Sequence, residues 1–181
     1  MELQSYNTLK INVLKKYLNP IFFETGTYLG DSVRLSLEAG FDKIISIEIN
    51  EELQNKNKLL FEKEITEGKV ELHLGDTLLI MGDIIKNLES PITFWLDAHF
   101  DFGVCGEKKC PLYEELNYIS ESKIKNHTIL IDDVRLFGKG NWGQEISEEE
   151  IIQKIKKINP NYAIKYEDGH VPNDILVAYI Q

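Results

Sequence analysis

Short apolar runs alternate along the chain with stretches whose apolar residues recur at a helical period. This alternation is typical of βαβ units, in which a helix carries the chain from one parallel strand to the next. It predicts an α/β fold with a mostly parallel sheet between two layers of helices. The predicted strands are Ile21–Glu24, Lys43–Ile49, Val70–Leu74, Ile92–Asp97, Thr128–Asp132, Tyr162–Tyr166 and Ile175–Ile180.

Local signals mark where several helices begin and end. Gly40 follows a helix predicted over residues 31–39, at a position where glycine tolerates the left-handed backbone that closes a helix. Asn50 and Ser147 are suited to cap the helices that follow them. Ser147 also has Glu150 three residues later, the spacing of a capping box.

Two runs, ITFWLDA and TILIDDV, are apolar until they reach their carboxylates, as expected for central strands covered on both faces. Their acidic residues therefore fall at the carboxyl ends of the strands. Ligands of open α/β sheets bind at this edge, where the strand order reverses. The last two predicted strands are joined by a short, turn-rich segment, residues 167–173, which has no room for a crossover helix and predicts an antiparallel pair.

Composition narrows the class of protein. With 181 residues, of which 43% are hydrophobic, the chain is expected to form one domain, with an N-terminal helix in residues 1–19 and a core in 20–181. A net charge of -10 repels phosphate backbones, so a nucleic-acid partner is not expected. Two cysteines, Cys105 and Cys110, are too few for a disulfide framework and fit a reducing cytoplasm. No segment approaches the roughly 20 apolar residues of a membrane span, and the N-terminus lacks the apolar stretch of a signal peptide.

The first chemical signal is the run FETGTYLG, residues 23–30, in which a strand enters a glycine turn before a helix. Gly26 and Gly30 would let the backbone approach a ligand closely. A dinucleotide site would favour G-x-G-x-x-G, and Glu24 would place a carboxylate beside the pyrophosphate. A ligand with an ammonium group and no phosphate suits this loop better. The alternative is an ordinary turn, with Glu24 exposed or capping.

Two further carboxylates follow at the ends of the next strands. Glu48 lies just over twenty residues after Gly26 and could accept hydrogen bonds from both hydroxyls of a ribose; alternatively it is a solvated acid at a strand end. Asp76 ends the third strand and could accept from an adenine amine, or cap the helix that starts at Thr77.

In this order of motifs the chain resembles the class I S-adenosylmethionine-dependent methyltransferases, from Ile21 to Ile180. The resemblance implies a Rossmann-like αβα sandwich with a seven-stranded sheet and an antiparallel last strand. It implies S-adenosyl-L-methionine as the cofactor, with Glu48 on the ribose and Asp76 on the adenine. The methionine part would be held by the loop from Glu24 to Gly30. The implied cofactor residues are Glu24, Thr25, Gly26, Thr27, Gly30, Glu48, Asp76 and Asp97.

Asp97, Asp132 and Asp133 are predicted to meet at the ends of adjacent central strands, where they would repel one another unless a cation or proton lies between them. Oxygen ligands favour Mg²⁺, Ca²⁺ or Mn²⁺ over zinc. The arrangement resembles the divalent-metal O-methyltransferases of the catechol and macrocin types, although the catechol type has Asp-Asn where this chain has Asp132-Asp133. Adjacent strand residues point to opposite faces, so both can bind one ion only if the backbone turns there. Alternatively, one aspartate caps the next segment and the other pairs with Arg135.

His99, two residues after Asp97, is a candidate general base because its ordinary pKa suits proton transfer near neutral pH; alternatively it only donates a hydrogen bond to an acid. Cys105 and Cys110 have a spacing compatible with zinc, but no second ligand pair accompanies them. Two segments, 100–110 and 134–146, leave the same edge and combine glycines with aromatic residues, including Trp142, as in a lid over a substrate. Trp142 could equally cover the core.

The predicted function is S-adenosylmethionine-dependent methylation of a small-molecule hydroxyl, assisted by a divalent metal such as Mg²⁺. Asp97 and His99 are the predicted catalytic residues, and Asp97, Asp132 and Asp133 the predicted metal ligands. Two other classes stay open: a non-catalytic module that binds an adenosyl ligand, and a nicotinamide-dependent reductase. The acceptor and the oligomeric state, a homo-oligomer included, are not determined by these patterns.

Overall fold

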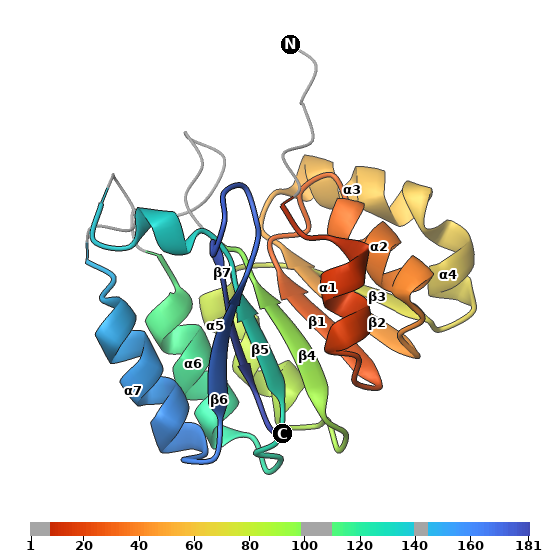
Figure 1. Ribbon diagram of the computed structural model, residues 1–181. Coiled ribbons are helices and arrows are strands. Elements are labelled where there is room, and N and C mark those ends of the chain that lie inside the picture. Colours follow the sequence, from red (N-terminus) through yellow and green to blue (C-terminus); the bar gives the residue numbers. More distant parts are fainter. Residues whose placement is uncertain (1–7, 99–109, 140–144) are drawn as a thin grey trace.

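A computed structural model describes residues 8–98, 110–139 and 145–181. Within this part of the chain, seven strands form one sheet in the order β3-β2-β1-β4-β5-β7-β6 (Figure 1). The strands are β1 (Ile21–Thr25), β2 (Lys43–Glu48), β3 (Val70–Leu74), β4 (Ile92–Leu96), β5 (Thr128–Ile131), β6 (Ala163–Glu167) and β7 (Ile175–Tyr179).

The strand pairing confirms the predicted topology. The five strands β1 to β5 pair in parallel, whereas β7 pairs antiparallel with both β5 and β6. Each predicted strand is present, and most ends differ by one residue. β4 and β5 stop just before Asp97 and Asp132, so these two carboxylates begin the connections that leave the sheet.

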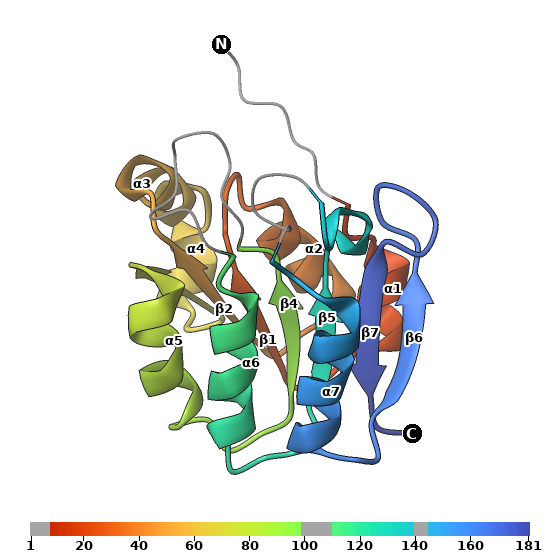
Figure 2. The ribbon, with the colours of Figure 1, turned by 90° about the vertical axis from the view of Figure 1, so that its left-hand side faces the viewer.

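Helices cover both faces of the sheet, as Figures 1 and 2 show from two directions. The helices α5, α6 and α7 lie on one face, and α1 and α2 lie on the other. Their bounds are α1 (Ile11–Lys16), α2 (Asp31–Ala39), α3 (Glu51–Leu60), α4 (Glu62–Thr66), α5 (Thr77–Ile85), α6 (Leu112–Glu121) and α7 (Glu148–Ile158), with a short 3₁₀ helix η1 (Val134–Leu136). Among the described residues no helix is both long and apolar enough to span a bilayer.

The central strands are apolar on both sides because each side faces a helix layer. In β4, Phe94 belongs to the cluster shared with α5, α6 and α7, while its neighbour Trp95 belongs to the cluster shared with α1 and α2. Phe23 and Phe22 divide in the same way in β1. One hydrophobic core therefore lies on each face of the sheet. Together the two cores hold in place the strand ends that carry the acidic residues.

The predicted helix signals are present in the structure. Gly40 closes α2 with a φ of 98°, and the Asn50 side chain accepts from the Leu53 N–H at 2.9 Å. The Ser147 side chain accepts from the Glu150 N–H. In a capping box the Glu150 carboxylate would accept from the Ser147 N–H directly. Here the Tyr113 hydroxyl lies between them: it accepts from the Ser147 N–H at 3.0 Å and donates to the Glu150 carboxylate at 2.6 Å.

The N-terminal segment contains the short helix α1. Of the segment 1–19, the structure describes residues 8–19, and α1 takes up six of them. Leu9, Val13 and Leu14 are buried against the α2 side of the sheet. A six-residue helix is marginal alone, so these tertiary contacts account for its presence.

Candidate functional site

The strand order reverses between β1 and β4, and the predicted loop lies at this point. Gly26 and Thr27 donate their N–H groups to the Ile47 carbonyl of β2, at 2.9 and 3.2 Å. On the other side, a Cβ added to Gly26 would lie 3.2 Å from the Asp97 carbonyl oxygen. The loop after β1 is therefore wedged between the ends of β2 and β4, the position at which open α/β sheets bind ligands.

The close approaches that require glycine here are to the protein itself. Gly30 has a φ of 79°, and a Cβ at this position would lie 2.7 Å from both Asn57 Oδ1 and Phe61 Cε2. Gly26 has a φ of 90° and meets the backbone after β4. Tyr28, between them, also has a positive φ, 47°. Its backbone is held at both ends, since its N–H donates to Glu48 and its carbonyl accepts from the Asn57 side chain at 2.8 Å.

Glu24 is completely buried, so it is not the exposed acid that one interpretation of the sequence allowed. Its carboxylate accepts from the hydroxyls of Ser32, in the first turn of α2, and of Ser46, in β2; the latter distance is 2.7 Å. Burial raises its pKa to about 8, and the charges of Asp97 and Glu48 add to this effect while the two serines oppose it. Glu24 therefore supports the loop from behind and stays largely protonated at neutral pH.

Glu48 ends β2 beside the same loop. One carboxylate oxygen accepts from the Tyr28 N–H and the other from the Asn50 N–H, both at 2.8 Å. The side chain is 4% exposed. Each oxygen retains lone-pair capacity beyond one accepted bond, so the carboxylate is fixed in place without being saturated.

The side chains of Asp76 and Thr27 are engaged in hydrogen bonds within the described part of the protein, whereas that of Thr25 is not. One oxygen of Asp76 accepts from the Leu78 N–H at 2.9 Å, so the helix-capping role considered for this residue is present. Thr27 shares a short hydrogen bond with Ser46. The Thr25 hydroxyl is buried and has no hydrogen-bond partner among the described residues.

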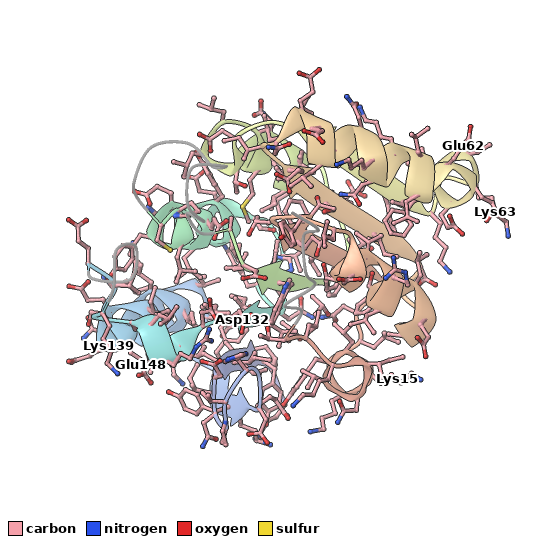
Figure 3. The ribbon with its side chains drawn as sticks, turned by 90° about the horizontal axis from the view of Figure 1, so that it is seen from above. Lys15, Glu62, Lys63, Asp132, Lys139 and Glu148 are labelled. Atoms are coloured by element: carbon pink, nitrogen blue, oxygen red, sulfur yellow. The ribbon has the colours of Figure 1, made fainter. Side chains whose placement is uncertain are left out.

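A shallow pocket opens at the ends of β4 and β5, with an enclosed volume of about 10 Å³, which is about the space of one water molecule. The described residues that line it are mostly apolar, with three acids among them: Leu96, Asp97, Ala98, Cys110, Leu112, Glu115, Ile131, Asp132 and Phe137. Figure 3 looks down on this edge of the sheet, with Asp132 near its centre. The predicted residues Asp97 and Asp132 thus meet in one pocket.

Glu115 was missed by the sequence analysis although a signal existed. It lies on α6 between Leu112 and Leu116, on the face that packs inward, and it is 1% exposed. A carboxylate on the apolar face of an amphipathic helix is unusual unless it is paired or hydrogen-bonded.

The backbone turns after β5, as a shared site for adjacent aspartates requires. Asp133 has a φ of 60°, and both Asp132 and Asp133 are buried. The carboxylates whose oxygens lie within 4.8 Å of one another are those of Asp132, Asp133 and Asp174. Asp97 is not in that group, and Asp174, from the β6–β7 connection, was not foreseen. No local pattern marks Asp174, because only the pairing of β7 with β5 brings it there.

Two of these acids share one cation. Arg135 donates through Nη1 to both Asp133 and Asp174, so the pairing of Asp133 with Arg135, one of the alternatives, is present. Asp132 differs from them. Its Oδ2 accepts from the Thr8 hydroxyl, while its Oδ1 is buried without a hydrogen-bond partner among the described residues. Burial raises the pKa of Asp132 above its usual range, and the charges of Asp97 and Asp133 contribute.

The structure describes only some of the remaining residues that the sequence analysis selected. Cys110 has a free thiol whose pKa is raised to about 12, mainly by burial, so it stays protonated at neutral pH. Phe137 lies on the pocket wall, as expected for the second predicted lid segment. His99, Cys105 and Trp142 lie outside the described residues, as does most of the first lid segment.

No protein-family model matches this chain, and no curated protein matches its sequence. Solved structures match its fold. An SAH-bound methyltransferase from Podospora anserina has a TM-score of 0.64 and 15% identity, over 94% of this chain and 76% of its own. A putative caffeoyl-CoA O-methyltransferase from Staphylococcus aureus has a TM-score of 0.63 and 14% identity, over 94% of this chain and 80% of its own. The spermidine synthase of Thermotoga maritima has a TM-score of 0.58 and 11% identity, over 94% of this chain and 56% of its own.

These matches confirm the expected fold, the Rossmann-like sandwich of the methyltransferases. At 11 to 15% identity they show the fold alone. The synthase shares that fold, so the fold does not by itself determine the reaction. The function must therefore be inferred from the residues at the edge of the sheet.

Proposed function

We propose that this chain, as one domain, is an S-adenosylmethionine-dependent methyltransferase acting on a small-molecule hydroxyl. The fold supports the proposal, and so does the order of acidic residues along one sheet edge. Glu48 ends β2, and Asp76 and Asp97 follow β3 and β4, so all three lie along the same edge of the sheet; Glu48 and Asp97 are next to the loop after β1.

The geometry of Glu48 carries the proposal. Its carboxylate is anchored by two backbone N–H groups, one from the glycine loop and one from the start of α3. An acid held rigidly beside this loop suits the paired hydroxyls of a ribose, because both can donate to lone pairs that the backbone bonds leave available. The loop next to it would then hold the amino-acid end of the same ligand.

Electrostatics favour an adenosyl amino acid over a dinucleotide. Glu48 and Asp97 act on Glu24 through their charges, so all three acids are near the loop. A pyrophosphate would bring its negative charges beside Glu48 and Asp97, at a Coulomb cost that a partly buried site does not screen well. A sulfonium and an ammonium are attracted instead. The nicotinamide-dependent reductase is therefore the weaker alternative.

The acceptor would bind at the ends of β4 and β5, where apolar residues around the shallow pocket suit contact with a small organic molecule. S-adenosylmethionine, when bound, would supply an electrophilic methyl group to the acceptor hydroxyl, and the electron pair of the broken carbon–sulfur bond would remain on sulfur. The protein would hold the two reactants in line and exclude water. His99, from the sequence analysis, or a pocket carboxylate would take the hydroxyl proton.

Asp97 and Asp132 would hold a divalent metal such as Mg²⁺. The buried Oδ1 of Asp132, which has no donor among the described residues, fits a cation at this position. Mg²⁺ often binds through one or two carboxylates together with water and substrate. Asp133 fits this role poorly, because Arg135 already pairs with it. A bound Mg²⁺ would lower the pKa of the acceptor hydroxyl and stabilise its developing charge.

Ligand-dependent stabilisation tests the proposal directly. Melting curves are recorded with S-adenosylhomocysteine, NAD or ATP, each with Mg²⁺ or a chelator. Of the three ligands, we expect only S-adenosylhomocysteine to raise the melting temperature, because a ligand that binds the native state stabilises it. Glu48→Gln should weaken this effect. Glu51→Gln, an exposed acid three residues further on, should not. No response to the adenosyl ligand, or an equal response in both variants, would reject the proposed site.

A non-catalytic adenosyl-binding module remains the second candidate. The completely buried Glu24 and the anchored Glu48 would serve such a module equally well, since neither acts on an acceptor. Turnover separates the two functions. Binding of S-adenosylhomocysteine without methyl transfer across a broad panel of hydroxyl compounds would favour the binding module.

A further inference from the structure

Asp132, Asp133 and Asp174 place three buried carboxylates within 4.8 Å of one another. Such a group is strongly unfavourable when fully ionised unless positive charge or protons compensate it. In many proteins a divalent ion fulfils this role, held by oxygen ligands from different loops. The question is what fulfils it in this chain.

Arg135 lies on η1, immediately after the acidic pair, and its guanidinium reaches across to the β6–β7 connection. Its Nη1 donates to Asp133 on one side and to Asp174 on the other. A guanidinium remains charged at all ordinary pH values and is weakly hydrated, which suits a partly buried ion pair. The arginine side chain is 29% exposed, whereas its partners are 8% and 0% exposed.

The pairing is built into the backbone around it. Asp174 accepts from the Arg135 N–H at 3.1 Å and from the His170 N–H at 3.2 Å, and its carbonyl accepts from the Val134 N–H at 3.0 Å. One aspartate thus holds η1 and the β6–β7 connection together, with Arg135 between them. The arrangement has the connectivity of a small metal centre, with a side chain in place of the ion.

We propose that Arg135 is a resident cation that substitutes for a metal ion between Asp133 and Asp174, and so leaves Asp132 as the member of this group that serves the pocket. Arg135 is a positioning residue, because it acts through the two acids and does not line the pocket. It pairs with two of the three carboxylates and compensates one of their negative charges. The remaining one, Asp132, keeps the unpartnered Oδ1 at the pocket wall.

Removing the arginine should therefore create a metal site. In Arg135→Gln, Asp133 and Asp174 lose their cation while Asp132 stays close, giving three oxygen ligands to a divalent ion. We expect this variant to bind Mn²⁺ at least roughly tenfold more tightly than the unaltered protein, which corresponds to about 1.4 kcal/mol. A residue that only stabilised the fold would not produce such a gain.

The experiment combines Mn²⁺ titration by electron paramagnetic resonance with melting curves of the full chain. In the presence of a chelator, Arg135→Gln should melt well below the unaltered protein, since Asp133 and Asp174 have lost the cation that they share. Saturating Mn²⁺ should then raise its melting temperature by roughly 5 °C or more, and the unaltered protein should respond less. If the variant is unfolded in chelator, folding on addition of Mn²⁺ is the same expected result.

Three further variants complete the test. Arg135→Lys keeps the charge and should show no gain in Mn²⁺ affinity. The double variant Arg135→Gln with Asp174→Asn should lose the gain. Asp97→Asn with Arg135→Gln should keep it, which makes the result independent of the proposed methyltransferase function and of a metal at Asp97. No Mn²⁺-dependent gain in Arg135→Gln, or an equal gain in Arg135→Lys, would overturn the inference.

Discussion

Replacing Glu24 by glutamine should change how the stability of this protein depends on pH. Burial raises the pKa of Glu24 from about 4.5 to about 8. Between these values the native state binds a proton that the unfolded chain releases. The free energy of unfolding therefore falls as pH rises through this window, is highest below it, and is level above about pH 8. Glutamine is neutral throughout and has nearly the same shape, so Glu24→Gln should not show this loss.

The size of the effect follows from the width of the window. Each pH unit within it removes about 1.4 kcal/mol, so about three units, from pH 5 to pH 8, remove on the order of 4 kcal/mol. The hydroxyls of Ser32 and Ser46 can turn to donate to or accept from the new amide, so the fold should tolerate the change.

Urea unfolding of both proteins at a series of pH values provides the measurement. Every other titrating group is shared, so the difference in free energy between the two proteins isolates Glu24. Glu24→Gln should be the more stable protein at about pH 9 and should lose this advantage near pH 5. A difference that changes by less than about 1 kcal/mol across the window would refute the argument that a buried, protonated Glu24 supports the loop.

Three other outcomes are expected. Gly30→Ala should destabilise the protein by about 2 to 4 kcal/mol in urea unfolding, because Gly30 has a positive φ and a Cβ there would collide with Asn57. Gly40 has a positive φ but open space around it, so Gly40→Ala should lower the free energy of unfolding by only about 1 kcal/mol. Equal losses in the two variants would contradict the role of packing at Gly30. His127 is buried and its pKa is lowered to about 4, so stability should fall as pH drops from about 6.5 towards 4; His127→Gln should lack this contribution, and parallel pH curves would contradict it. Asp97→Ala should reduce methyl transfer roughly 100-fold or more, while calorimetry shows S-adenosylhomocysteine binding largely intact; unchanged activity would remove Asp97 from the mechanism.

Several features of this protein could be predicted from local patterns. The apolar runs identified β1, β2, β4, β5 and β7 because a strand buried on both faces must be apolar along its length. The short connection before β7 predicted its antiparallel pairing, since a parallel return needs a crossover. The acids that follow the strands could be assigned to one edge because parallel strands end on the same side.

Other features depended on contacts between distant segments. Glu24 was expected near a ligand, but Ser32 and Ser46 enclose it from two neighbouring elements. Both interpretations of Asp76 began from the same sequence, and the structure contains the capping bond. A strand-end acid has the same local pattern whether it points into the protein or out of it, so its surroundings decide its role.

The sequence by itself determined which strands and helices follow one another along the chain and the edge of the sheet at which the acidic residues gather, because hydrophobic periodicity and strand direction are local properties. Only the tertiary structure decided which acids share a partner. Asp174 reaches Asp133 because β7 pairs with β5 in a particular register, and Arg135 then lies between them. Charge compensation falls steeply with distance, so it depends on positions of a few ångströms that no spacing along the chain specifies.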